Sequence, residues 1–291
     1  MKPALRIHPT EVCIWTGMII FLLLTLYPML HVVFASISQP ALLMAHRGPI
    51  LWPEGFSTAA YRHLFTNQYI LSGLVSSAVL VIGGVLVNVV ATAIAAYVLS
   101  KRQARAVKFF TVFVVFTFLF SGGLIPLYLT IRSYGLYNSY LAIILPFAIS
   151  MVNLLILRTA FESLPASLEE SARIDGAGHL TILGRIAMPL VMPTEAVIIL
   201  YYTVDRWNGW FYASIFFKDR ELYPLQLILR EILTINESVG MMADVDQSDR
   251  AMMAESIKYA AIVLGTLPVL AVYPFLQRFF IKGSLMGAVK E

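Results

Sequence analysis

Three polar residues, Asn88, Asn153 and Glu195, interrupt long apolar stretches of this sequence. Polar side chains inside a membrane-length apolar segment are costly, and they usually face a cavity or a hydrogen-bonding partner. Each of the three therefore has two interpretations: a hydrogen bond between helices, or a place on the route of a polar solute. Glu195 also follows Pro193 closely, so its carboxylate could bond backbone groups that the proline leaves free.

Aromatic and polar residues are mixed in the segment YYTVDRWNGWFY, residues 201–212. Flat aromatic rings can stack on sugar rings, and Asp205, Arg206 and Asn208 can bind hydroxyl groups. Trp and Tyr are also enriched where a membrane meets water, so an aromatic belt is the alternative interpretation. The candidate substrate path from these segments consists of Asn153, Glu195, Tyr202, Trp207 and Asn208.

The sequence lacks the patterns that bind metals or nucleotides. Its five histidines are scattered without metal-ligand spacing, Cys13 is the single cysteine, and no G-x-x-x-x-G-K-[ST] pattern occurs. FSGGL (120–124) superficially resembles an ATPase signature, but it lies in an apolar run and is typical of a closely packed membrane helix. No catalytic triad or paired acid is evident. We therefore expect a chain that is not an enzyme, binds no cofactor itself and takes its energy from partners.

The composition indicates that lipid is the solvent for much of the chain. Of 291 residues, 59% are hydrophobic and 13% are charged, and the mean hydropathy is +0.78. A soluble domain of this size cannot bury so much apolar surface. Six apolar runs are long enough to span a membrane: 13–36, 72–99, 109–130, 140–160, 187–205 and 257–277. Prolines interrupt the run 187–205, so five spans are the alternative.

Basic residues in short loops predict the orientation. The loop SKRQARAVK (100–108) contains four Lys or Arg residues, whereas RSYGLYNS (132–139) contains only Arg132. Basic loops stay on the cytoplasmic side, so six spans would place both termini and 161–186 in the cytoplasm and 206–257 outside. The basic clusters beside apolar runs fit this role better than nucleic-acid binding, and we expect no nucleic-acid partner.

One polar, glycine-containing segment, SLEESARIDGAGHLTILGRIAMPLVMP (167–193), lies between apolar runs. Ser167 and Glu170 have the spacing of a capping box, which predicts a short helix that begins there. Gly176 is expected to end this helix, because glycine enters the left-handed conformation freely. A second helix, HLTILGRIAM (179–188), should lead back into the membrane. A solvated loop with common helix caps is the alternative interpretation.

This segment resembles the EAA loop of ATP-binding-cassette importer permeases, in which E-A-A-x-x-x-G is followed by I-x-L-P. Ser171 and Met188 are small or volume-conserving departures from that pattern. The segments FSGGLIPLYLTIRSYGLYNSYLAIILP, WNGWFYASIFF and GAVKE are similar to the carbohydrate-uptake branch, of the MalG and LplC/YtcP types. The matching EAA positions are Glu170, Ala172, Gly176, Ile186 and Pro189.

The resemblance implies an all-α polytopic membrane protein of the type I importer fold, with six transmembrane helices and a cytoplasmic coupling helix. It divides the chain into an N-terminal helix and first outer loop (1–71), a permease core (72–280, with EAA loop 161–186 and outer loop 206–257) and a tail (281–291). The residues it implies for coupling to an ATPase are Glu169, Glu170, Ser171, Ala172, Asp175 and Gly176. Ala172 is small and shares a face with Leu168, so another surface could approach closely there.

The implied partners are a second homologous permease, a dimer of ATP-binding subunits that hold ATP and magnesium, and an extracytoplasmic solute-binding protein. The implied cargo is a sugar or oligosaccharide, and the location is the bacterial cytoplasmic (inner) membrane. The outer loop 206–257 is either a docking surface for the binding protein or a plain surface helix with an acidic tail. A secondary transporter or channel, which would need its own coupling-ion site, and a membrane enzyme are the rival classes.

The last ten residues, KGSLMGAVKE, are expected to be too polar and glycine-rich to extend the final spanning helix. The resemblance implies that this tail reaches the ATP-binding subunits through Lys282, Gly283 and Lys290. A frayed terminus that only obeys the positive-inside rule is the alternative.

Overall fold

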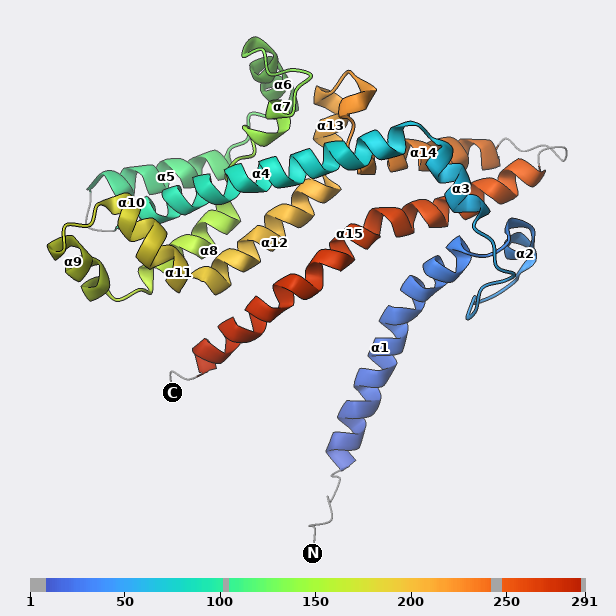
Figure 1. Ribbon diagram of the computed structural model, residues 1–291, viewed down its shortest axis with the longest axis horizontal. Coiled ribbons are helices and arrows are strands. Elements are labelled where there is room, and N and C mark those ends of the chain that lie inside the picture. The colour runs from blue at the N-terminus through green and yellow to red at the C-terminus, as the bar shows by residue number, and fades with distance from the viewer. Residues whose placement is uncertain (1–8, 102–104, 242–247, 289–291) are drawn as a thin grey trace, which may run out of the picture. The chain divides into compact units, whose positions relative to one another are not determined.

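The computed structural model describes residues 9–101, 105–241 and 248–288, and this part of the chain is almost entirely helical (Figure 1). Its strand-like pairing is an isolated antiparallel bridge between Ser38 and Phe56. Contacts divide the chain into two compact units. The first is Met1–Gln68 with Leu229–Thr266, and the second is Tyr69–Ile228 with Leu267–Glu291.

The first unit has a small core at the end of its long N-terminal helix. Phe34 and Ala35 there pack with Leu43, Ile50 and Tyr259. Most of the first helix exposes apolar side chains, as expected of a helix surrounded by lipid. The unit contains α1 (Pro9–Ser36), α2 (Pro40–Ala45), α3 (Ala59–Thr66), most of α14 (Leu225–Met241) and the first part of α15 (Ser248–Ala288).

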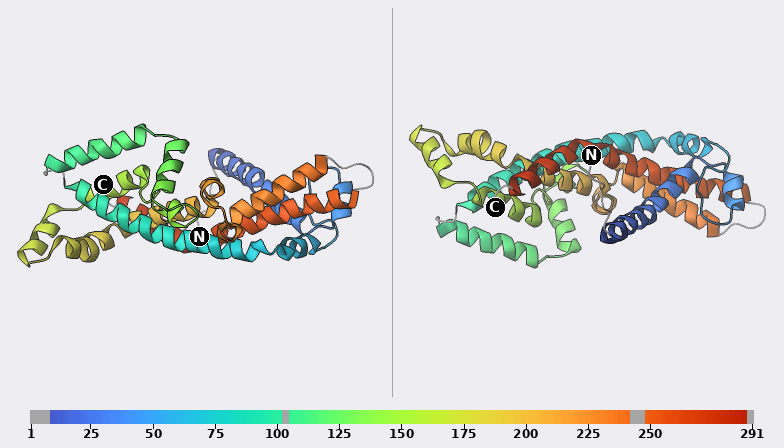
Figure 2. Two further views of the ribbon diagram at one scale, coloured as in Figure 1. Left: turned by 90° about the horizontal axis from the view of Figure 1, so that it is seen from above. Right: turned by 90° about the horizontal axis from the view of Figure 1, so that it is seen from below.

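The second unit is built around α4 (Tyr69–Ser100), against which α8 (Met151–Glu162) and α12 (Met192–Asn208) pack (Figure 2). Small residues on α4 allow close approach. A Cβ on Gly73 would lie 2.5 Å from Cδ1 of Ile228. The remaining elements are α5 (Arg105–Leu119), α6 (Leu124–Ser133), α7 (Leu141–Ile144), α9 (Ala166–Ile174), α10 (His179–Ile182), a π-helix (Leu183–Ala187), α11 (Met188–Leu190), α13 (Phe211–Phe216) and a 3-10 turn (Arg220–Leu222).

Three of the described helices are long and apolar enough to cross a membrane: Thr10–Ser36, Tyr69–Ser100 and Met252–Val272. Two bent pairs would raise this number to five, Ala106–Leu119 with Leu124–Ser133 at 114°, and His179–Leu190 with Met192–Asn208 at 89°. The expected continuous span over 140–160 is wrong, because that stretch is divided between α7 and α8.

The glycines of FSGGL make a bend instead of the close helix packing expected from the sequence. Residues 120–123 are non-helical and separate α5 from α6. Gly123 has φ +85°, which L side chains rarely adopt, and a Cβ there would meet nothing within 4 Å. The glycine is therefore needed for its backbone conformation.

Arg206 and Asn88 compensate for the break between α7 and α8. Arg206 donates hydrogen bonds to the carbonyls of Ile143 at 3.0 Å and Phe147 at 2.6 Å, and to Oδ1 of Asn88 at 3.1 Å. Nδ2 of Asn88 donates to the carbonyls of Phe147 and Ala148, both at 2.7 Å. Buried backbone groups outside a helix need such partners, because an unpaired buried polar group is costly.

The structure contradicts the expected end of the last spanning helix. Helix α15 continues to Ala288, with Pro268 and Pro274 inside it, so Lys282 and Gly283 belong to a helix and not to a separate tail. Lys290 lies outside the described residues.

Candidate coupling site and solute path

Helix α9 forms where the sequence predicts it, but not by the predicted capping. Its N-cap is Pro165, one residue before Ala166, and the N-cap makes no side-chain hydrogen bond. The capping-box prediction for Ser167 and Glu170 is therefore wrong. Proline fixes its own φ near the required value and favours the entry into the helix without a side-chain acceptor.

The end of α9 has the geometry of a Schellman motif. Gly176 has φ +80°, and its N–H donates to the carbonyl of Arg173 at 3.0 Å. The next N–H, of Ala177, donates to the carbonyl of Ala172 at 2.9 Å. Two carbonyls at the helix end are thus satisfied, and the chain reverses within two residues.

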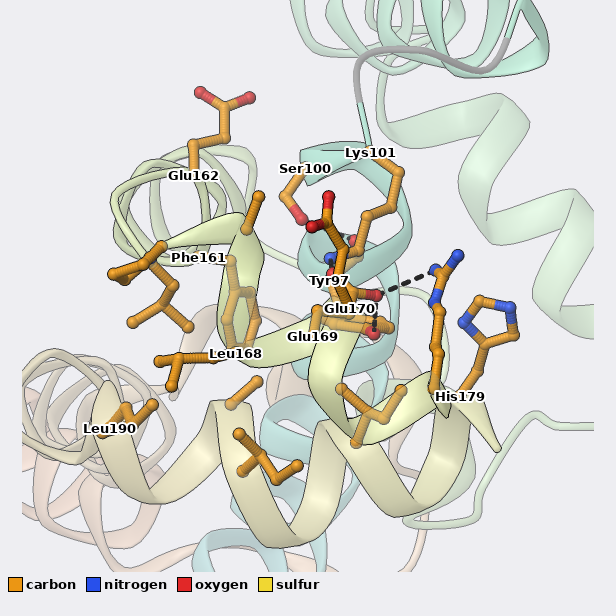
Figure 3. A pocket seen from close by; sticks show the side chains of 17 residues that line it. Tyr97, Ser100, Lys101, Phe161, Glu162, Leu168, Glu169, Glu170, His179 and Leu190 are labelled. Atoms are coloured by element: carbon orange, nitrogen blue, oxygen red, sulfur yellow. Dashed lines mark hydrogen bonds and ion pairs between the residues drawn. The ribbon is translucent and has the colours of Figure 1, made fainter. Parts of the chain in front are cut away.

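Glu169 joins α9 to the end of α4, as Figure 3 shows. Its carboxylate accepts a hydrogen bond from the hydroxyl of Tyr97 at 2.7 Å and forms an ion pair with Lys101. Arg173, one turn further along α9, donates to the same carboxylate at 3.0 Å. The ammonium of Lys101 also lies 4.2 Å from the centroid of the Tyr97 ring.

The surroundings of Glu169 favour its charged form. Partial burial alone would raise the pKa of this carboxyl, but hydrogen bonds from Lys101 and Tyr97 and the positive charge of Lys101 outweigh burial, so the pKa is lowered below its ordinary value. The ion pair is therefore present throughout the neutral pH range.

The six residues predicted for coupling lie in two different environments. Ala172 is buried in this chain's own core, packed with residues such as Leu183 and Ala187, which contradicts the expectation that another surface approaches it. Glu169 faces α4. The four that are exposed are Glu170, Ser171, Asp175 and Gly176.

A hollow of about 680 Å³ lies beside α9. Its wall combines apolar side chains such as Phe161 and Leu168 with the acids Glu162, Glu169 and Glu170 (Figure 3). The predicted second helix after the turn is not one α-helix: it passes through the π-helix Leu183–Ala187 before the bend at Val191. A π segment marks a local change of register, often at a functional position.

The residues predicted for the substrate path, like those predicted for coupling, include both buried and exposed side chains. Tyr202 is buried, and its hydroxyl is bonded to Oγ1 of Thr92 at 2.7 Å and accepts the N–H of Ser150 at 2.9 Å. Asn88 makes the hydrogen bonds between elements that were one of its two interpretations. Trp207 is buried as well, whereas Asn208 is exposed.

Glu195 is almost completely buried, with 1% of its surface exposed. Among the described residues its two carboxylate oxygens have no hydrogen-bond partner. It lies in the first turn of α12, just after the bend at Val191, and its N–H donates to the carbonyl of Val191 at 3.0 Å. The carboxylate does not line any of the hollows described here.

Two hollows adjoin the C-terminal half of α12 and share Tyr201 and Asp205. The larger, of about 670 Å³, also contains Asn208 and Trp210 in its wall. The smaller, of about 370 Å³, contains the buried Asn153. Asp205 is the charged residue in both walls, and these volumes lie within the range of small-molecule sites.

Sequence reasoning missed Tyr97 and Lys101, and it misjudged Arg206. The sequence placed Arg206 among the groups that could bind a solute hydroxyl, but its guanidinium is turned inward and bonded to this chain. An arginine inside an apolar segment was the available signal, because such a charge needs internal partners.

A family model described as "Binding-protein-dependent transport system inner membrane component" matches residues 88–284. The chain belongs to this family. Its members are non-catalytic membrane components of transport systems, so the chain is a permease subunit and not an enzyme.

Relatives match almost the whole chain. The polygalacturonan/rhamnogalacturonan transport system permease protein YtcP of Bacillus subtilis (strain 168) is 39% identical, over 96% of this chain and 98% of YtcP. Protein LplC of the same organism is 39% identical over 92% of this chain and 90% of LplC. A crystal structure of a bacterial ABC transporter involved in the import of the acidic polysaccharide alginate aligns with TM-score 0.82 and 30% identity, covering 93% of this chain and 96% of that chain. The expected family and importer-permease fold are confirmed.

Proposed function

We propose that this chain is a permease subunit of an ATP-driven, binding-protein-dependent importer of a sugar or oligosaccharide. The supporting observation is the 39% identity to YtcP over nearly the full length of both chains. The partners would be a second permease, two ATP-binding subunits that hold ATP and magnesium, and an extracytoplasmic binding protein. Reconstitution of the four components in liposomes tests this: a sugar panel should stimulate ATP hydrolysis and uptake, and ion-driven uptake without ATP would instead favour a secondary transporter.

We further propose that α9 and the following turn dock on an ATP-binding subunit. Glu170 is exposed on α9, and two large apolar side chains beside it are exposed as well, Ile174 by 86% and Leu180 by 77%. Exposed apolar groups with adjacent charge, on a segment outside the spanning helices, are typical of an interaction surface. In the same assembly the end of α15, with Lys282 and Gly283, and the residues that follow it in sequence, with Lys290, would reach the ATP-binding subunits. Deletion of 283–291 should then alter the coupling of hydrolysis to uptake.

The proposed topology has six crossings with both termini in the cytoplasm, in the bacterial inner membrane. In a Cys13→Ser background, a single cysteine at Tyr134, 76% exposed after α6, should react with an impermeant thiol reagent in intact cells. A cysteine at Leu180 should react only after the cells are opened. The reverse labelling pattern would overturn this orientation and the coupling role of α9 together.

The two hollows beside α12 are proposed as part of the solute path, with Asp205 and Asn208 as hydrogen-bonding groups and Tyr201 and Trp210 as aromatic walls. Asp205→Ala should lower sugar uptake by about tenfold, because a charged acceptor for hydroxyl groups is lost. Glu221→Gln is the matched control, since Glu221 is exposed and lies outside both hollows. Equal uptake by the two variants would remove Asp205 from the path.

A further inference from the structure

Helix α9 is held in the second unit by more than its two chain connections. Three donors converge on the carboxylate of Glu169: Tyr97 in the last turn of α4, Lys101 directly after α4, and Arg173 from α9 itself. The side chains of Lys101 and Glu169 are 34% and 20% exposed, so their ion pair is partly shielded from water. A partly shielded, hydrogen-bonded pair keeps a defined geometry better than an exposed one.

Helix α4 also carries the contacts that organise the proposed solute path. Thr92 bonds the hydroxyl of Tyr202, and Asn88 holds the unwound carbonyls of Phe147 and Ala148. Gly84 lies against the side chain of Arg206, since a Cβ there would be 3.2 Å from its Nε. The distance along the axis from Tyr97 to Asn88 is about 14 Å at 1.5 Å per residue.

We infer that Glu169 is a positioning residue that fastens α9 to α4 and gives this element a third connection to the solute path. The other two connections are covalent, through α8 before it and α10 after it. A movement of α9 is transmitted through the Tyr97–Lys101 contact to α4, and from α4 to the groups that surround Phe147 and Tyr202. Two adjacent acids thus have separate tasks: Glu169 faces inward to α4, and Glu170 faces outward. This inference rests on the proposed docking of α9.

Stiffness is the physical reason that a third connection matters. A short helix attached only by its two chain ends can rotate about the axis through them, and a movement of its partner is then lost in that rotation. A third contact away from this axis fixes the orientation of the helix. Coupling free energies between sites are only a few times the thermal energy, so loss of a few hydrogen bonds is enough to reduce them strongly.

The test uses the complete transporter in liposomes with the variants Tyr97→Phe, Lys101→Met and Glu169→Gln, singly and combined. Each variant should assemble with its partners and hydrolyse ATP, while uptake per ATP hydrolysed falls about three- to tenfold. The double variant Lys101→Met with Glu169→Gln should be no worse than the more affected single variant, because the two residues act through one contact. Additive losses would overturn the inference. Tyr97→Phe removes a single oxygen atom and keeps the ring, so it preserves the fold if a larger change does not.

Two controls separate this inference from the proposed function. Lys108→Met removes an exposed lysine from the neighbouring α5, and uptake per ATP should stay unchanged. Glu170→Gln should weaken association with the ATP-binding subunit. One outcome is that Glu170→Gln has that effect while Tyr97→Phe and Lys101→Met leave uptake per ATP unchanged. That result refutes the inferred connection of α9 to α4 through Glu169 and leaves the docking proposal standing. If Glu170→Gln and the exposed apolar variant Ile174→Ser both assemble normally, the docking proposal fails.

Discussion

Gly176→Pro is expected to abolish productive association with the ATP-binding subunits while the chain still inserts in the membrane. Proline cannot adopt φ +80°, and it removes the N–H that donates to the carbonyl of Arg173. The turn after α9 must therefore adopt another conformation, and a nine-residue helix is too short to be stable without its end contacts. Co-purification of the subunits and sugar-stimulated ATP hydrolysis measure the loss.

A graded series isolates the role of the left-handed residue. Gly176→Ala keeps the N–H, and its Cβ meets nothing within 4 Å, so only the conformational cost of about 1–2 kcal/mol remains. Gly176→Asn should be milder than alanine, because asparagine tolerates this conformation. Gly178→Ala should be neutral, since Gly178 has φ −75°. If Gly176→Pro supports normal uptake, the Schellman motif has no role in coupling.

Arg206→Met should destabilise the second unit by about 2–6 kcal/mol, because it leaves two buried acceptors without a donor at a cost of about 1–3 kcal/mol each. Methionine fills a similar volume but leaves the carbonyl of Ile143 and the side-chain oxygen of Asn88 without the donor that Arg206 supplies, and the carbonyl of Phe147 keeps only the hydrogen bond from Asn88 among those described. Thermal unfolding of the purified subunit in detergent should show a clearly lower midpoint.

Arg206→Lys and Asp205→Asn complete this experiment. Lysine places one charge on a flexible side chain and cannot supply the fixed set of guanidinium donors. The unfolding midpoint of the Arg206→Lys protein should therefore lie between those of the Arg206→Met protein and the wild type. Asp205 is adjacent in sequence but exposed, and Asp205→Asn should leave the midpoint nearly unchanged. An Arg206→Met protein as stable as wild type would show that the break is supported in another way.

Features set by neighbouring residues could be predicted from the sequence. Helix α9 ends where Gly176 requires a left-handed residue, and the predicted helix from Ser167 to Asp175 differs by one residue at each end from Ala166–Ile174. The membrane character followed from composition. A hydrogen-bonding role for Asn88 between separate segments was one of its two predicted interpretations. These rules act within a few residues, so a single sequence contains what they need.

Features that depend on distant partners could not be predicted. Tyr97 and Glu169 are 72 residues apart, and nothing in local spacing indicates their contact. The continuous span over 140–160 failed because Arg206 and Asn88 stabilise unwound backbone that apolar composition alone would assign to a helix. The glycine-rich end of the chain was predicted to leave the helix, yet α15 continues to Ala288, which shows that scattered glycines do not by themselves end a long helix.

The unwound stretch between α7 and α8 changes how these two helices can move. A continuous helix behaves as a rod, since each turn is bonded to the next, and tilting one end tilts the other. Here the carbonyls of Phe147 and Ala148 are bonded to a side chain of α4, and the N–H of Ser150 to a side chain of α12. The two helices therefore need not tilt together, because the backbone between them is held by hydrogen bonds to α4 and α12 and not by helical turns.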